Sequence, residues 1–389
     1  MRKRDRLNQA STFQKKGNYR GDYMFVVVVL LYILYLISFI FIANRFIYAL
    51  KLSSPAKYFC YVTSVVLSVV SILAFIGRRN DHDFFTFISP LSFVLMGAWA
   101  ITISFAVLNE VINLAVIPFK IKNFRYYSTL ITACVCAAAS LWSIINCAFI
   151  QRIKEVSISV PSLSVPEFKI VQLSDIHIGA GTNIASIKKT FETASAQNPD
   201  IIVFTGDIID TDILKNDAYL NYGFNSLKAR YGIFAVTGNH DHYTGVEIFY
   251  ELMRRCGITV LRDDSIVLEN IINISGINDV SFRSEEMITI ALSDIDKNYP
   301  VLFLSHRPEA FDFAAKTAAN LVQLSGHTHG GQIPPIEIAR RFFMKYNLGV
   351  YQSNDSVMFV SSGVRWWGPP MRFGNFCEIS VINLLGGKN

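Results

Sequence analysis

Apolar and polar residues are distributed very differently in the two halves of this chain. The first 150 residues contain four long apolar runs without a charged side chain: Met24–Ala43, Phe59–Ile76, Phe84–Leu108 and Tyr126–Ile150. A helix rises about 1.5 Å per residue, so roughly 20 apolar residues cross the hydrocarbon core of a bilayer. The pattern therefore predicts a transmembrane region of four helices at residues 24–150, preceded by a basic tail at residues 1–23.

After residue 150 the apolar runs become short, and they alternate with segments in which apolar residues recur at helical spacing. Five runs rich in Val, Ile, Leu and Phe predict buried strands: Phe168–Leu173, Ile201–Thr205, Gly232–Thr237, Val301–Ser305 and Leu321–Ser325. Between the first two, apolar residues from Ile184 to Ala194 recur at helical spacing. This alternation is typical of an α/β sheet with helices on its faces. We therefore expect a linker at residues 151–166 and a catalytic domain at residues 167–389.

Charge is also divided unevenly along the chain. Residues 1–150 contain 15 Lys and Arg against 5 Asp and Glu, whereas residues 151–389 contain 21 against 25. The acidic excess in the second half argues against nucleic acid as its partner. The basic tail predicts a cytoplasmic amino terminus, and four crossings of the cell (inner) membrane then place the catalytic domain in the cytoplasm. Lys120, Lys122 and Arg125 would lie on the opposite side, which leaves the sidedness open.

Metal-ligand side chains follow the predicted strands. Each strand ends in a motif that carries Asp, Asn or His, and the motifs place the following candidates in order: Asp175, His177, Asp207, Asn239, His240, His306, His327 and His329. The carboxyl ends of strands in an open α/β sheet are where ligands bind, so these side chains can converge. This donor set suits borderline divalent ions, with Mn expected first and Fe or Zn as alternatives.

The order of these motifs resembles the calcineurin-like metallophosphoesterase superfamily. The residues concerned are Asp-x-His, Gly-Asp, Gly-Asn-His-Asp, a lone His and Gly-His-Thr-His, and the resemblance runs from about residue 165 to the end. The late Ser-Ser-Gly-Val-Arg-Trp-Trp-Gly-Pro-Pro-Met-Arg resembles a branch whose members often carry amino-terminal membrane helices. The resemblance implies an α/β (α+β) sandwich of two β-sheets flanked by helices, and two divalent metal ions as cofactors.

The same resemblance implies a role for each motif residue. One metal is expected on Asp175, His177, Asp207 and His329, and the other on Asp207, Asn239, His306 and His327, with Asp207 bridging. His240 is expected as the catalytic residue that protonates the leaving group. An anionic bridge offsets the repulsion of two close cations, and hydroxide held by both metals is a nucleophile at neutral pH.

Four neighbouring polar residues have less defined roles. Asp210 and Asp241 either orient metal ligands or serve as surface and capping residues. Arg307 either contacts phosphate or faces solvent. His242 has no supporting motif, and we expect it to be structural.

The substrate is expected to be a phosphodiester or pyrophosphate, and two features favour an amphipathic one. The chain is anchored in the membrane, and residues 336–348 mix Arg340, Arg341 and Lys345 with aromatic side chains. Such a stretch lies on a membrane surface, covers an acyl chain, or packs in the core. Some members of the superfamily hydrolyse UDP-2,3-diacylglucosamine to UMP and acyl-sugar phosphate in lipid A synthesis, which is the specific hypothesis here. The alternatives are a phosphatase or nucleotidase for soluble substrates and a non-catalytic, membrane-tethered metal-binding sensor.

Overall fold

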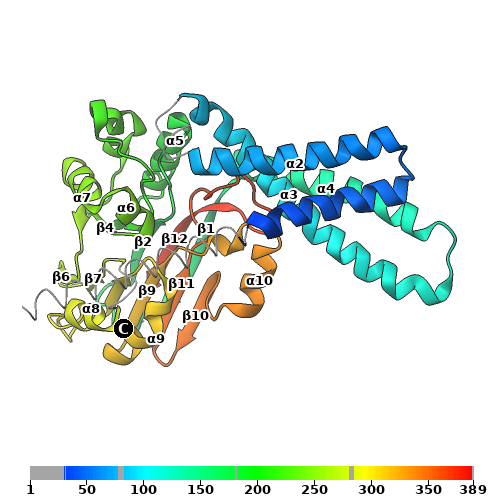
Figure 1. Ribbon diagram of the computed structural model, residues 1–389. Helices are drawn as coiled ribbons and strands as arrows, with labels where there is room; N and C mark the ends of the chain where they lie inside the picture. Colours follow the sequence, from blue (N-terminus) through cyan, green and yellow to red (C-terminus); the bar gives the residue numbers. More distant parts are fainter. Residues whose placement is uncertain (1–29, 31, 78–82, 180–181, 280–283, 388–389) are drawn as a thin grey trace, which may run out of the picture. The chain divides into compact units, whose positions relative to one another are not determined.

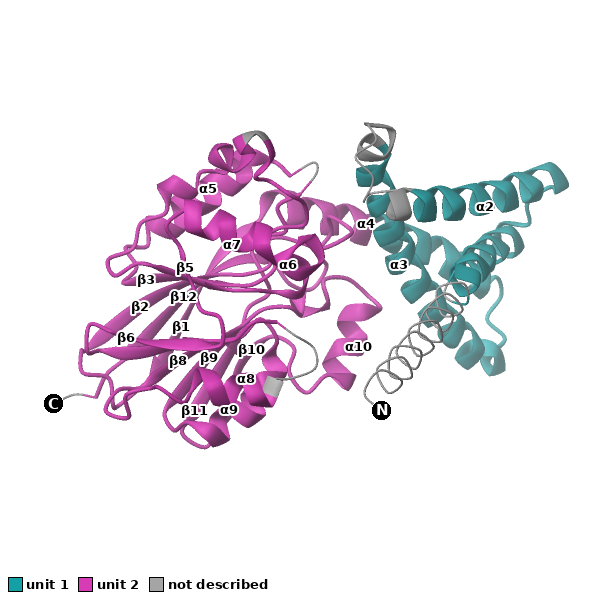
Figure 2. Cartoon of the chain, turned by 60° about the vertical axis from the view of Figure 1, so that its left-hand side comes forward, with its two compact units in different colours: residues 1–137 teal, residues 138–389 magenta. Residues whose placement is uncertain are grey.

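The structure is a computed structural model that describes residues 30, 32–77, 83–179, 182–279 and 284–387. The predicted basic tail at residues 1–23 and the beginning of the first apolar run lie outside the described residues. The chain divides into two compact units, Met1–Ala137 and Ala138–Asn389, and each is described here by itself (Figure 2).

Four long apolar helices occupy the region where membrane spans are predicted. The first is described over Tyr32–Leu50, and it is followed by α2 (Ser54–Gly77), α3 (Asp83–Val116), the short η1 (Ile117–Phe119) and α4 (Phe124–Phe149). Only 11% to 28% of the residues in each candidate span are buried inside the chain. Since their apolar side chains mostly face outward, these helices suit a lipid environment rather than a protein core.

The second unit contains two six-stranded sheets. The first has the strand order β1-β12-β2-β3-β4-β5 and the second has the order β10-β11-β9-β8-β7-β6. The strands of the first sheet are β1 (Gln151–Ser159), β12 (Cys377–Leu385), β2 (Glu167–Leu173), β3 (Ile201–Thr205), β4 (Ile233–Val236) and β5 (Thr259–Val260). Those of the second are β10 (Gly349–Ser353), β11 (Ser356–Val360), β9 (Leu321–Ser325), β8 (Val301–Leu304), β7 (Ile272–Gly276) and β6 (Asp264–Leu268).

The two sheets pack face to face, and helices cover their outer faces (Figures 1 and 2). Side chains such as Ile170 and Val203 from the first sheet meet Leu304 and Leu324 from the second in one apolar cluster. The first sheet's outer face packs against α5 (Ile184–Ser195), α7 (Val246–Arg255) and the 3-10 segments η2 (Lys215–Tyr222) and η3 (Phe224–Ser226). The second sheet's outer face packs against α8 (Ser284–Ala291) and α9 (Phe311–Thr317). The predicted two-sheet sandwich is therefore confirmed.

All five predicted strands are present, because each is a short, mostly apolar run bounded by turn residues. They are β2, β3, β4, β8 and β9, and they lie side by side in the middle of the two sheets. Parallel pairing joins β2 to β3 and β3 to β4, and it also joins β8 to β9. Parallel neighbours end at the same edge, so the residues that follow these strands are brought together.

Residues 151–166, which the sequence pattern assigns to a linker, contain a strand instead. Strand β1 pairs in parallel with β12 over nine residue pairs, from Gln151 with Cys377 to Ser159 with Leu385. Its side chains are mostly exposed because β1 is the edge strand of its sheet. The charged residues Arg152, Lys154 and Glu155 interrupt the apolar–polar alternation by which a strand is recognised in a sequence. The sheet therefore begins one residue after α4 rather than after a spacer.

Candidate metal centre

The candidate ligands lie on loops at the carboxyl ends of the central strands. Asp175 and His177 follow β2, Asp207 follows β3, and Asn239 begins the short helix α6 (Asn239–Thr244) after β4. From the second sheet, His306 follows β8, and His327 and His329 follow β9, with His329 opening the 3-10 turn η5 (His329–Gly331). Both sheets thus supply side chains to the same end of the sandwich.

Five of these residues have an unusual backbone conformation. Asp175, His177, Asp207, His327 and His329 have φ angles of 56°, 51°, 54°, 69° and 50°, in the left-handed region that non-glycine residues seldom adopt. Each such residue carries a conformational cost on the order of 1–3 kcal/mol, and such strain concentrates at functional sites. The clustering of five positive φ angles on these loops is independent of the motif, and it points to the same residues.

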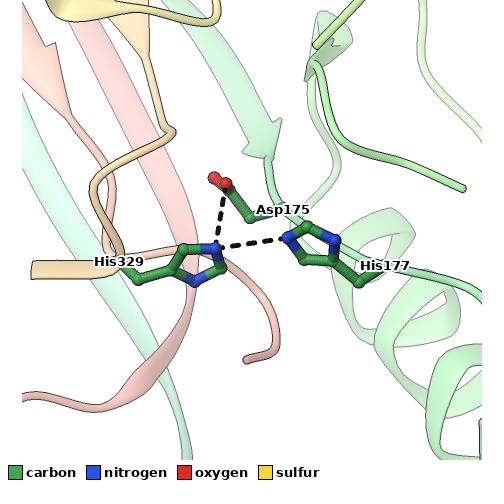
Figure 3. Close-up of side chains that lie close together, drawn as sticks. All are labelled: Asp175, His177 and His329. Atoms are coloured by element: carbon green, nitrogen blue, oxygen red, sulfur yellow. Dashed lines mark hydrogen bonds and ion pairs between the residues drawn. The ribbon is translucent and has the colours of Figure 1, made fainter. Parts of the chain in front are cut away.

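A first group of side chains converges around His329. Its Nε2 atom lies 3.3 Å from Asp175 Oδ1 and 3.2 Å from Nε2 of His177 (Figure 3). The Nε2 atom of His177 lies 3.9 Å from Asp207 Oδ2. Three of these ligand atoms, from Asp175, His177 and His329, lie within 4.8 Å of one another, as a shared metal ion requires.

A second group converges on the other side of Asp207. Nε2 of His306 lies 3.2 Å from Asp207 Oδ2 and 3.2 Å from Nδ1 of His327. Asn239 Oδ1 is buried and has no hydrogen-bond partner among the described residues. A buried carbonyl oxygen without a partner is costly, and a cation is a partner that would satisfy it. Asp207 belongs to both groups, which is the arrangement expected of a bridging carboxylate.

A second layer of hydrogen bonds orients the histidine rings. Asp210 Oδ1 lies 3.0 Å from Nδ1 of His177 and 2.8 Å from Nδ1 of His240, while Nδ1 of His306 lies 2.8 Å from the Thr205 carbonyl oxygen. Such contacts place the ring proton on Nδ1 and leave the Nε2 lone pair for a metal. Of the two roles left open for Asp210, the structure supports orientation of the ligands.

Asp241 is a fully buried carboxylate that ties two loops together. Its oxygens accept hydrogen bonds from the backbone N–H groups of Asp207, Ile208, Ile209 and Gly238, at 2.9, 2.9, 3.0 and 2.7 Å. Burial and the charge of Asp207 raise the pKa of Asp241, and these N–H donors oppose the rise. Asp241 therefore fixes the backbone of the bridging residue, which is neither a surface role nor a simple helix cap.

Of the two remaining neighbours, Arg307 contacts a site residue and His242 has a structural role. Arg307 is half-buried, donates to Asp279 Oδ1 at 2.7 Å, and lies 3.3 Å from Nε2 of His327. It is therefore engaged with the site rather than free in solvent. His242 lies 3.1 Å from Thr237 Oγ1, in agreement with the structural role expected for it.

Arg372 is a site-supporting residue whose role the sequence does not reveal. It is fully buried, and its guanidinium donates to the His329 carbonyl oxygen at 3.3 Å and to Asn375 Oδ1 at 2.7 Å. Asn375 donates to the same carbonyl at 2.9 Å. The late motif of the sequence contains Arg372, but only the fold brings it beneath His329, 43 residues earlier in the chain.

The electrostatics of the cluster favour bound cations. Burial lowers the pKa of His306, but the carboxylates of Asp207 and Asp175 outweigh it and raise that pKa to about 10. Burial and the positive charges of His306 and Arg307 lower the pKa of His327 to about 2. Burial likewise lowers the pKa of His329, so His327 and His329 stay neutral and can act as ligands, while the buried carboxylates favour positive charge at His306 and His177. The residues present fit a site for two divalent cations.

Comparisons with known proteins agree with this geometry. Residues 168–331 match the family described as calcineurin-like phosphoesterase. An uncharacterized metallophosphoesterase of Helicobacter pylori is 31% identical over 239 residues, which cover 60% of this chain and 64% of that protein. The metallophosphoesterase YkuE of Bacillus subtilis is 33% identical over 228 residues, covering 56% of this chain and 79% of that protein. A Danio rerio transmembrane protein with metallophosphoesterase domain is 28% identical over 283 residues, covering 68% and 64%.

The fold and site define a metallophosphoesterase. The chain belongs to the calcineurin-like phosphoesterase family, whose members typically bind two divalent metal ions. It spans slightly less than two thirds of the length of the Helicobacter and Danio relatives, and its four apolar helices accord with the transmembrane description of the latter.

Proposed function

We propose that this chain is a membrane-anchored phosphoesterase that uses two divalent metal ions. One ion would be held by Asp175, His177, Asp207 and His329, and the other by Asp207, Asn239, His306 and His327. The position of Asp207 carries the proposal, because its carboxylate lies 3.9 Å from His177 and 3.2 Å from His306, in contact with both groups. Mn is the metal we propose first, since imidazole with hard oxygen donors suits such ions.

Two cations at this site would neutralise phosphate oxygens and activate water for attack on phosphorus. The protein's own residues supply orientation and a proton. Asp207 is held in place by the N–H of His240, which donates to its Oδ1 at 2.7 Å, and by the contacts of Asp241. A Cβ at Gly238 would stand 2.2 Å from the same Oδ1, so only glycine allows the two loops to approach this closely.

His240 is the proposed proton donor for the leaving group. Its ring is fixed by Asp210 on Nδ1 at 2.8 Å, and it packs edge-on against His177, with ring centroids 4.7 Å apart. The contact with Asp210 occupies Nδ1, so Nε2 is the ring nitrogen that would exchange a proton with the leaving group.

Replacing His240 with Asn should lower kcat by about a hundredfold for an alkyl phosphodiester, the low end of the usual contribution of acid catalysis. The loss should be much smaller for bis(p-nitrophenyl) phosphate, because p-nitrophenolate leaves without protonation. Steady-state kinetics on both substrates test this difference. An equal loss on both would assign His240 to binding or structure rather than proton transfer.

Arg340 is a second residue that we propose to contact the substrate. It lies on α10 (Ile336–Phe343), the helix that follows η5, and its Nη1 is buried without a hydrogen-bond partner among the described residues. Burial lowers the pKa of Arg340, and the negative charges of Glu309 and Asp175 oppose that shift. The positive charge of Arg340 in turn contributes to the low pKa of His327. A buried guanidinium N–H without a partner, whose charge acts on His327, suits a phosphate oxygen of the substrate.

Replacing Arg340 with Ala should raise KM by about tenfold, since a hydrogen bond to a charged group is worth ~1.5–3 kcal/mol. Arg341→Ala is the matched control, because Arg341 is exposed and paired with Glu337 at 2.7 Å. Initial-rate kinetics on one phosphodiester separate the two variants. If both raised KM equally, the effect would come from the helix as a whole and not from Arg340.

For the substrate we propose a lipid-linked or nucleotide-linked phosphodiester or pyrophosphate at the cytoplasmic face, and UDP-2,3-diacylglucosamine is the specific compound to try. The apolar helices and the basic tail support this choice. Soluble phosphate esters are the second candidate, because the two-metal arrangement itself makes no distinction between them. A metal-binding sensor without turnover is the third, but the sequence retains every proposed ligand and His240.

A substrate panel tests the proposed function. Full-chain protein in detergent would be assayed with a phosphomonoester, a phosphodiester and UDP-2,3-diacylglucosamine, with added Mn and with a chelator. We expect Mn-dependent hydrolysis of at least the diester, and the products of the third compound decide whether it is a substrate. Protein that binds Mn but hydrolyses none of the three would contradict the enzyme proposal and favour the sensor.

A further inference from the structure

Helix α10 has its polar and apolar faces reversed relative to a surface helix of a soluble protein. Its apolar side chains point outward, with Ile336, Ile338, Phe342 and Phe343 exposed by 53%, 50%, 79% and 86%. The charged Glu337, in contrast, is buried against the domain. A surface helix ordinarily buries its apolar stripe. The sequence left open whether these aromatics pack in the core, and for Phe342 and Phe343 the exposure excludes it.

The exposed face continues into the loop that follows the helix. Met344 and Leu348 are also exposed, and so is Trp367 from the late motif. Two cations border the apolar residues: Arg341, paired with Glu337 at 2.7 Å, and Lys345, paired with Asp312 at 2.6 Å. An apolar face bordered by Arg and Lys is the composition of helices that lie in the interfacial layer of a bilayer.

A single turn, residues 372–375, joins α10 to the last turns of α4. On one side of it, a Cβ at Gly374 would stand 2.2 Å from Glu337 Oε1, so the turn packs directly on α10. On the other side, Arg372 N–H donates to the Ser143 carbonyl oxygen at 3.0 Å, and Asn146 Nδ2 donates to the Arg372 carbonyl oxygen at 2.8 Å. These residues of α4 belong to the same compact unit as the sandwich.

The last turns of α4 are themselves apolar and exposed. Leu141, Trp142, Ile145 and Phe149 have exposed side chains, and α4 as a whole is one of the four candidate membrane spans. Trp142 Nε1 donates to the carbonyl oxygen of Phe373, in the turn at residues 372–375, at 3.3 Å. Tryptophan is enriched at membrane–water interfaces. The turn at residues 372–375 therefore connects α10 to a helix whose length and composition suit a bilayer.

We propose that α10 is a membrane-binding surface of the catalytic unit, and that its partner is the lipid bilayer. Ile336, Ile338, Phe342 and Phe343 would enter the acyl region, with Arg341 and Lys345 at the level of the headgroup phosphates. Arg340, the proposed phosphate-binding residue, lies on the same helix, and its Nη1 is buried. The helix would thus hold the site at the depth of lipid phosphates. This membrane contact goes beyond the proposed hydrolysis and does not depend on it.

Photo-crosslinking tests the proposal without an activity assay. Full-chain protein with p-benzoylphenylalanine in place of Phe343 would be reconstituted into nanodiscs of phosphatidylcholine and phosphatidylglycerol, irradiated, and analysed by intact-mass spectrometry. The matched control carries the same residue in place of Leu220, a side chain of η2 that is also strongly exposed. We expect phospholipid adducts at position 343 that exceed those at position 220 by about tenfold or more, in keeping with burial in the acyl layer.

Two results would overturn the proposal. Equal lipid labelling at positions 343 and 220 would mean that α10 faces water. Crosslinks from position 343 to a second copy of the chain would mean that the apolar face is a dimer contact instead. Failure of the proposed hydrolysis leaves both readouts intact, because neither requires turnover.

Discussion

Asp207→Asn should lower kcat/KM for a phosphodiester by about a thousandfold or more. The substitution preserves the shape of the side chain but removes the negative charge that two neighbouring cations would share. Metal ions supply several kcal/mol of transition-state stabilisation, and each 1.36 kcal/mol corresponds to a factor of about ten in rate. Because Asp207 Oδ2 contacts both His306 and His177, its loss should affect both metal positions at once.

The control for this variant is Asp294→Asn, which removes the same charge from an exposed position of the same unit. It should leave kcat/KM and metal content unchanged. Metal content of both variants would be measured by elemental analysis after removal of excess ion. An Asp207→Asn protein that kept wild-type activity would show that this carboxylate does not bridge the metals.

Asp241→Asn should destabilise the catalytic unit by about 3–5 kcal/mol, the cost of breaking a buried charged hydrogen-bond network. The carboxylate accepts four backbone N–H bonds, and an amide offers only one acceptor oxygen in its place. At least two buried N–H groups would then lack a partner. For a unit of this size, the melting temperature should fall by on the order of 10 °C.

Thermal unfolding of the full chain in detergent, followed by circular dichroism, measures this shift. Asp312→Asn is the comparison, since it removes an exposed ion pair with Lys345 and such pairs contribute little. Added Mn should not restore the Asp241→Asn protein to the wild-type melting temperature. A shift no larger than that of Asp312→Asn would mean that Asp241 is not a structural tie of the bridging loop.

The central strands and the site residues were predictable because their signals are local. Each strand is a short apolar run, and each ligand lies within a few residues of its end, as with Asp175 and His177 after β2. The parallel pairing of β2, β3 and β4 then brings the strand ends together without further information. Local sequence therefore indicated an α/β sheet and the candidates for the metal centre, whereas the two-sheet sandwich was expected from the family resemblance. Metal binding itself remains a prediction.

The supporting contacts were not predictable because they join distant parts of the chain. Asp241 is held by donors 32 to 34 residues before it, apart from Gly238, and Arg372 acts on His329 from 43 residues away. The motif residues next to Asp241 indicated that it has a role near the site. They did not show whether Asp241 caps a helix at the surface or is a buried acceptor of backbone hydrogen bonds from two loops. Residues this far apart in the sequence come into contact only in the folded chain.

The sequence pattern also did not predict the edge strand of the first sheet or the face of α10 that packs on the protein. Strand β1 is exposed along most of its length, so its polar side chains conceal a strand that pairs with β12. For α10, the sequence shows that the helix is amphipathic but not which face meets the protein. The burial of Glu337 and the exposure of Phe343 decide that question, and they reverse the usual arrangement.

The number of metal ions bound per chain tests the central claim most directly. Purified full-chain protein would be stripped with a chelator, titrated with Mn, and assayed on bis(p-nitrophenyl) phosphate at each step, with bound metal measured by elemental analysis. The shared position of Asp207 predicts two ions per chain, and full activity only when the second has bound. Full activity with a single ion, or in the absence of any metal, would contradict the account.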